Sequence, residues 1–101
     1  MRKYEIMLIL PADADEGVVA GVTDRIRQTL AERGGEIVGT TPWGRRRLAY
    51  PIGHRSEGFY LIVDCTADPD AMKELDRVLS LADDVVRFKV VVRSAADRKT
   101  A

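Results

Sequence analysis

Residues 4–11, Tyr-Glu-Ile-Met-Leu-Ile-Leu-Pro, establish the architecture of this chain. In an extended segment alternate side chains point to opposite faces, and the set that begins with Tyr4 is entirely apolar. The other set also contains apolar residues, Met7 and Ile9. Apolar residues on both faces predict a central strand that is at least partly covered on both sides. Pro11 ends the strand.

A helix, two strands and a second helix follow in the sequence pattern. Asp15 is the expected N-cap of the first helix, which Gly34-Gly35 ends. Residues from Glu36 to about Ile52 then form a long strand, which we expect to be interrupted at Pro42-Trp43-Gly44 because proline inside a strand indicates an edge or a bulge. A polar turn at Gly53–Glu57 is followed by a strand at Gly58–Thr66. The second helix is capped by Asp68 and has Pro69 at its first position. A turn at Asp83-Asp84 then leads into a last strand at Val85–Val92.

The resulting order, βαββαβ, predicts an α+β fold of the ferredoxin-like class. We expect a four-stranded antiparallel sheet with two helices packed on one face, the first and third strands being central and the arginine-rich second strand an edge. A chain of 101 residues is expected to form one domain, residues 1–93, followed by a polar, flexible tail at residues 94–101. The expected core residues are Ile6, Leu8, Leu10, Ile26, Leu30, Phe59, Leu61, Val63, Leu75, Leu79, Phe88 and Val90.

The uncovered face of this sheet mixes apolar and basic side chains, which is typical of a surface that contacts partners. Its expected members are Lys3, Met7, Ile9, Tyr60, Ile62, Arg87, Lys89, Val91 and Arg93.

The charge of the chain is balanced, with 16 basic and 16 acidic residues, which argues against indiscriminate binding to nucleic acid. The charges are nevertheless segregated, because basic segments at 43–57 and 85–101 flank an acidic segment at 64–84. Folding that brings the two basic segments to one side would create a cationic surface. The longest apolar run, Ile6–Leu10, is too short to cross a membrane, and the N-terminus lacks the features of a signal peptide. We therefore expect a cytoplasmic protein.

The sequence offers little for catalysis. His54 is the only histidine and lies in a predicted turn, and Cys65, the only cysteine, lies on the predicted core face. No cluster of residues has metal-ligand spacing, so no enzyme activity, metal site or cofactor is expected. The aromatic motif of RNA-recognition modules is matched only at Gly58 and Phe59, and Phe59 belongs to the expected core. Stacking of RNA bases on the sheet is therefore not expected. The remaining mode of RNA binding is contact between arginines and the backbone of a folded RNA.

The segment Gly44-Arg45-Arg46-Arg47-Leu48-Ala49-Tyr50-Pro51-Ile52 resembles the signature of the bacterial small-subunit ribosomal protein six family (bS6). The start Met1–Ile6, the strand opening Gly58-Phe59-Tyr60 and the close Val90-Val91-Val92 are also similar to that family. The resemblance covers nearly the whole chain. Gly53 and Trp43 depart from the family pattern, and for Trp43 we favour local packing over a partner contact.

The resemblance implies a structural constituent of the small (30S) ribosomal subunit, located in the cytoplasm on the ribosome, with no catalysis. It implies binding to a helical junction in the central domain of 16S ribosomal RNA, as a heterodimer with small-subunit protein eighteen and with no small-molecule substrate. Arg45, Arg46 and Arg47 match the basic motif, Arg2 and Arg87 match basic positions near the first and last strands, and Tyr50 matches the motif tyrosine.

Strand geometry qualifies these candidates. Arg45 and Arg47 share one side of the strand and Arg46 lies on the other, so the three cannot grip one phosphate track without a bulge. Arg87, Lys89 and Arg93 are either RNA contacts or a solvated edge kept basic against aggregation. Tyr50, Tyr60 and Ile62 are either satellite core or a protein-partner surface, which we favour. An alternative function is a ferredoxin-like regulatory or dimerisation module that binds a small ligand.

Overall fold

The structure, a computed structural model, describes the backbone of residues 1–52 and 55–93 and the side chains of residues 1–48 and 57–92. Its elements follow the predicted order: β1 (Arg2–Pro11), α1 (Glu16–Ala31), β2 (Glu36–Ile52), β3 (Arg55–Ala67), α2 (Pro69–Ser80) and β4 (Arg87–Arg93). Some boundaries differ from the prediction: β3 begins at Arg55, within the expected turn, and β4 begins at Arg87, two residues later than expected. Gly53, His54 and the predicted tail at 94–101 lie outside the described residues.

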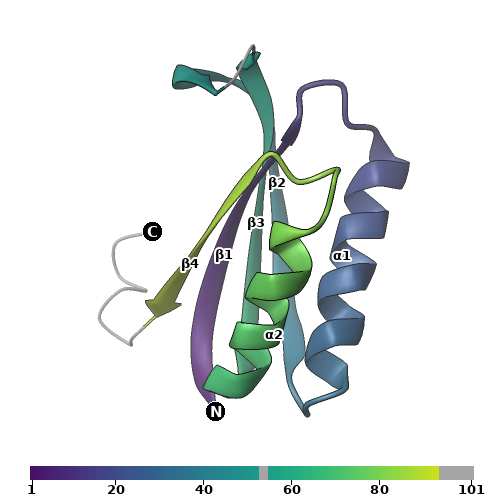
Figure 1. Cartoon of the computed structure of the whole chain (residues 1–101), viewed down its shortest axis with the longest axis vertical. Coiled ribbons are helices and arrows are strands. Elements are labelled where there is room, and N and C mark those ends of the chain that lie inside the picture. Colours follow the sequence, from purple (N-terminus) through teal and green to yellow (C-terminus); the bar gives the residue numbers. More distant parts are fainter. Residues whose placement is uncertain (53–54, 94–101) are drawn as a thin grey trace.

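The four strands form one antiparallel sheet in the order β2-β3-β1-β4, with both helices on the same face (Figure 1). This confirms the predicted ferredoxin-like fold, its central strands β1 and β3, and its two edges. The register places Ile6 opposite Val63 on one side and Val90 on the other, so the apolar face of β1 continues across the sheet.

The core lies between this face and the helices. Most of the expected core residues are buried, but Phe59, Phe88 and Val90 are only partly buried at its margin. Phe88 and Val90 belong to the edge strand β4, which has a neighbouring strand on one side only, and Phe59 lies near the end of the sheet where the hairpin leaves the helices. Further buried apolar residues are Tyr4, Val22, Cys65, Ala67, Ala71 and Met72.

The two helices begin at the predicted caps. The Asp15 carboxylate accepts a hydrogen bond from the Val18 backbone N–H at 3.0 Å, satisfying a donor that the first turn leaves unpaired. Asp68 caps α2 with an extended backbone but without a side-chain hydrogen bond. At the other end of α1, Gly34 adopts a φ of 78°, a left-handed conformation that glycine enters without steric cost.

Strand β2 is irregular, as its proline predicts. Its register against β3 shifts between Ile37 and Gly39, between Pro42 and Gly44, and between Arg47 and Ile52. At the second shift Trp43 is the extra residue of a bulge, and Gly44 has a φ of 85°. The joined ends of β2 and β3 project beyond the helices (Figure 1).

Candidate functional site

The open face of the sheet, which the helices leave uncovered, is divided into an apolar half and a charged half. In the apolar half, Ile9 lies between Tyr60 and Arg87, and Met7 lies between Ile62 and Lys89. In the charged half, one cross-strand row contains Val91, Glu5, Asp64 and Gly39, and the next contains Lys3, Thr66 and Glu36. The apolar half is the one nearer the projecting hairpin.

Three side chains stack at the border of the apolar half. The Trp43 and Tyr60 rings are nearly parallel, inclined by 13°, with centroids 6.5 Å apart. The guanidinium carbon of Arg46 lies 5.4 Å from the centroid of the Trp43 ring, within the range of a cation–π interaction. At the bulge in β2, Trp43 and Gly44 together lie opposite Tyr60. The bulge also shifts the alternation that follows, which places Arg46 on the same open face as Tyr60.

The arginine triplet is split between the two faces of the sheet. Arg45 lies opposite Phe59, which borders the core, and Arg47 lies opposite Glu57, whereas Arg46 lies opposite Gly58 on the open face. No register shift separates the three arginines, so the strand alternation expected from the sequence is confirmed. All three side chains are exposed.

The other predicted site residues do not form one cluster. Arg87 and Lys89 are exposed on the open face of β4, at the sheet edge opposite Arg46. Arg2 lies at the far end of β1, opposite Ala67, on the strand face that carries the core. Ile62 is on the open face but only 5% exposed, so it forms the floor of the apolar half. The side chains of Tyr50 and Arg93 lie outside the described residues.

Sequence reasoning missed Leu48 as a member of the apolar half. For Trp43 it favoured local packing, and the ring does contact Tyr60 and Arg46 but remains 48% exposed. Leu48 is 7% exposed although it shares the open face with Arg46. It packs over Gly58, where a β-carbon would lie 3.4 Å from a Leu48 methyl carbon and 2.5 Å from Cγ2 of Ile9. A glycine at the start of an apolar strand, two positions from a tyrosine, is the sequence signal for such close packing.

The side chains that could act as catalytic groups, such as the thiol of Cys65, are unsuited to catalysis in this structure. Burial, and secondarily the Asp64 carboxylate, raise the pKa of the Cys65 thiol to about 11, so the thiolate nucleophile is scarce at neutral pH. Within residues 1–52 and 55–93 no group of three acidic, histidine or cysteine side chains could hold a metal ion. Across the same residues no helix is long and apolar enough to span a membrane.

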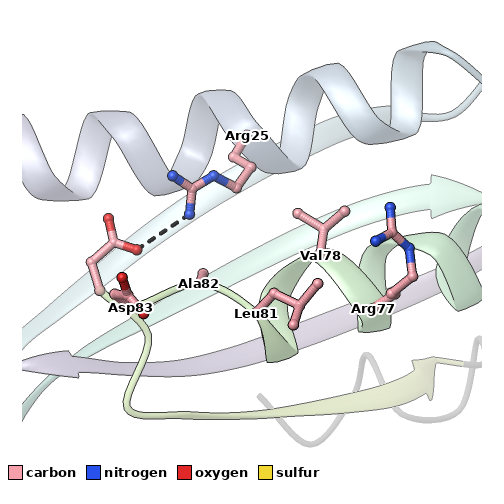
Figure 2. Close-up of a pocket in the computed structure, with 7 residues that line it drawn as sticks. Arg25, Arg77, Val78, Leu81, Ala82 and Asp83 are labelled. Atoms are coloured by element: carbon pink, nitrogen blue, oxygen red, sulfur yellow. Dashed lines mark hydrogen bonds and ion pairs between the residues drawn. The ribbon is translucent and has the colours of Figure 1, made fainter.

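A hollow of about 490 Å³ on the helix side is a structural junction (Figure 2). Arg25 of α1 reaches across it to the Asp84 carboxylate at 3.3 Å, which ties α1 to the loop after α2. Arg77, at the other end, is hydrogen-bonded to Glu74 one turn earlier in the same helix. The remaining lining residues are Val78, Leu81, Ala82 and Asp83, which offer no nucleophile and no proton donor paired to a base.

Comparison with known proteins identifies the family and supports the fold. A family model for ribosomal protein S6 matches residues 3–92. The chain belongs to the ribosomal protein S6 family. Similar proteins named small ribosomal subunit protein bS6 occur in Beutenbergia cavernae (45% identity, covering 90% of this chain and 95% of the relative) and in Caldanaerobacter subterraneus (41%, covering 90% and 96%).

The fold of the ribosomal protein S6 family is also seen in a solved structure. The crystal structure of 30S ribosomal protein S6 from Thermotoga maritima superposes with a TM-score of 0.82 at 25% identity, covering 98% of this chain and 94% of that one. The chain is thus a structural, non-enzymatic constituent of the small ribosomal subunit and is located on the ribosome in the cytoplasm. Its partners are the RNA and proteins of that subunit. This membership argues against the alternative function, a free-standing module that binds a small ligand.

Proposed function

We propose that this chain binds the central domain of 16S ribosomal RNA at a helical junction, together with small-subunit protein eighteen. The observation that carries the proposal is the arrangement of cations around an apolar surface. Arg45 and Arg47 extend from one face of the projecting hairpin, while the opposite face carries a half-exposed tryptophan and a row of apolar side chains. Such a surface suits two partners of different chemistry.

The arginines suit the RNA because a guanidinium presents a planar fork of donors to phosphate oxygens. Contacts of this kind position a protein on a folded RNA without reading its sequence. The basic residues that we propose as RNA contacts are Arg2, Arg45, Arg46, Arg47, Arg87, Lys89 and Arg93.

The apolar half of the open face suits a protein. Tyr60 is half-buried and Ile62 forms the floor beneath it, so a partner that covers them removes apolar surface from water. Tyr50, Tyr60 and Ile62 are the proposed partner surface. We further propose that residues 1–93 act as one domain.

Neither surface is large or strongly charged enough to act alone. The net charge of zero gives little long-range attraction to RNA, and the acids of the charged half, Glu5 and Asp64, share the open face with the basic residues of β4. Protein eighteen would supply the additional contacts, and binding of the two proteins would be cooperative on the RNA.

A combined substitution tests the proposal. The variant Arg45→Ala/Arg46→Ala/Arg47→Ala removes three exposed cations, so it should fold normally but be incorporated poorly into reconstituted small subunits. Circular dichroism and thermal melting control for the fold, and quantitative mass spectrometry of purified subunits gives occupancy. Wild-type occupancy of the variant in competition with the wild-type protein would contradict the proposal.

A further inference from the structure

We infer that the Arg46–Trp43–Tyr60 stack anchors a second protein, whereas Arg45 and Arg47 face the RNA. The occupant is a protein segment that sets an apolar side chain against Trp43 and presents a carboxylate to Arg46. This inference rests on the proposed function and refines it in one respect: Arg46, grouped above with the RNA contacts, is assigned to the protein partner instead. Arg46 would then strengthen RNA assembly through the protein partner.

The register of β2 against β3 determines which arginines face the RNA and which faces the second protein. Arg45 pairs with Phe59 and Arg47 with Glu57, so both side chains leave the sheet on the side of the helices. Arg46 pairs with Gly58 and leaves on the open side. A single flat surface cannot touch both sets, because the sheet itself lies between them.

The three residues of the stack are of types that often dominate the binding energy of protein–protein interfaces. Trp43 remains 48% exposed although it contacts both Tyr60 and Arg46. Tryptophan, tyrosine and arginine are the residues most enriched among those that dominate binding energy, because they bury a large area at a small cost in side-chain entropy. The stack holds the Trp43 ring in one orientation before a partner arrives, which lowers the ordering cost further.

Charge complementarity defines the occupant. Among the residues with described side chains, the charged groups that border the apolar half are Arg46, Arg87 and Lys89, and all are basic. The acids of the open face lie beyond Met7 and Ile62, in the charged half. A guanidinium stacked on an aromatic ring keeps its in-plane N–H donors available, and a carboxylate is the side-chain acceptor that matches their fork.

A protein fits the stack better than a nucleobase. The surface beside the stack is aliphatic, built from Met7, Ile9 and the buried floor of Ile62. Aliphatic side chains complement apolar protein segments and offer no hydrogen bond to a base edge.

The fluorescence of Trp43 reports the occupant directly, because Trp43 is the only tryptophan of the chain. We expect protein eighteen, prepared as a variant without tryptophan, to shift the emission of Trp43 to shorter wavelength and to reduce its quenching by acrylamide. An RNA fragment containing the junction, added without the protein, should leave both signals unchanged. If the RNA alone protects Trp43 and the protein does not, the occupant is a nucleic acid and the inference is overturned.

Matched substitutions at adjacent positions separate the two partners. Arg46→Lys keeps the charge but removes the planar guanidinium, and Arg46→Ala removes both. Each should weaken the affinity for protein eighteen, the alanine variant by about tenfold or more. Arg45→Ala and Arg47→Ala should leave that affinity within twofold of wild type. In the RNA complex they should instead reduce the slope of log K against log salt by about 1 each.

The outcomes distinguish this inference from the proposed function. If the wild-type chain binds neither the protein nor, with it, the RNA junction, the proposed function fails and this inference fails with it. If both bind but the variants at 45, 46 and 47 affect protein binding equally, only the inference is overturned. Thermal melts guard against misfolding, and Trp43→Leu provides a second variant that should weaken protein binding without changing net charge.

Discussion

Gly58 is the residue on which the apolar half of the open face depends. It is buried where β3 passes between β1 and β2, opposite Pro11 on one side and Arg46 on the other. The space that a side chain would fill is occupied by Ile9 and Leu48. A hydrogen in place of a β-carbon therefore lets two aliphatic side chains cover the backbone.

Gly58→Ala should destabilise the protein by about 1–3 kcal/mol, because the new β-carbon would lie 2.5 Å from Cγ2 of the branched Ile9 side chain. Urea denaturation gives the free energy of unfolding. The matched control is Gly21→Ala on the exposed side of α1, where a β-carbon meets nothing within 4 Å. That substitution should instead stabilise the protein by about 1 kcal/mol. Equal effects of the two substitutions would contradict the packing described.

Cys65 should make the stability of the protein depend on pH in alkaline solution. Burial, with a smaller effect of Asp64, raises the thiol pKa from its ordinary value of 9.0 to about 11 in the folded state. The unfolded chain therefore loses this proton first. The contribution to stability is complete below pH 9 and is lost as the pH rises towards 11. Comparing the unfolding free energy of wild type with Cys65→Ala across this range isolates the effect, and parallel curves would refute it.

At the scale of elements, the sequence was sufficient for much of the fold. The caps Asp15 and Asp68, the alternation of β1 and the proline of β2 predicted the six elements, the strand order and the face that the helices cover. These features depend on local chemistry and on one period of alternation, both of which can be read from neighbouring residues.

The composition of the candidate site was harder to predict because it depends on strand register. The bulge at Pro42/Gly44 shifts the alternation of the residues that follow it, so that Arg46 and not Arg45 lies on the open face. A sequence pattern indicates that a strand is interrupted without saying where the extra residue is placed. The interaction of Trp43 with Tyr60 joins two strands and is visible only once their pairing is known. Leu48 was missed for the same reason.

The two helix caps provide a matched pair of predictions. Asp15→Ala removes the hydrogen bond to the Val18 N–H and should cost about 1 kcal/mol. Asp68→Ala removes no such bond and should cost less, although it also removes a carboxylate 3.8 Å from the N-terminal ammonium. Chemical denaturation of both variants, with Asp15→Ser as a rescue, measures the difference. A larger loss for Asp68→Ala would mean that the capping geometry is reversed.

At the scale of the whole molecule, folding does not gather the two basic segments into one patch. β2 and β4 form opposite edges of the sheet, although Arg46, Arg87 and Lys89 share its open face. Three strand spacings of about 4.8 Å separate these edges by roughly 14 Å. The apolar half of the open face lies between them. This arrangement favours a surface completed by a second protein over a continuous groove for RNA.

The central claim is therefore that RNA binding is shared. The most direct test is the affinity of this chain for the central-domain junction of 16S ribosomal RNA, measured across a range of salt concentrations with and without small-subunit protein eighteen. We predict weak binding by the chain alone and strong, salt-dependent binding when the second protein is present. Tight binding that is unaffected by protein eighteen would contradict the account.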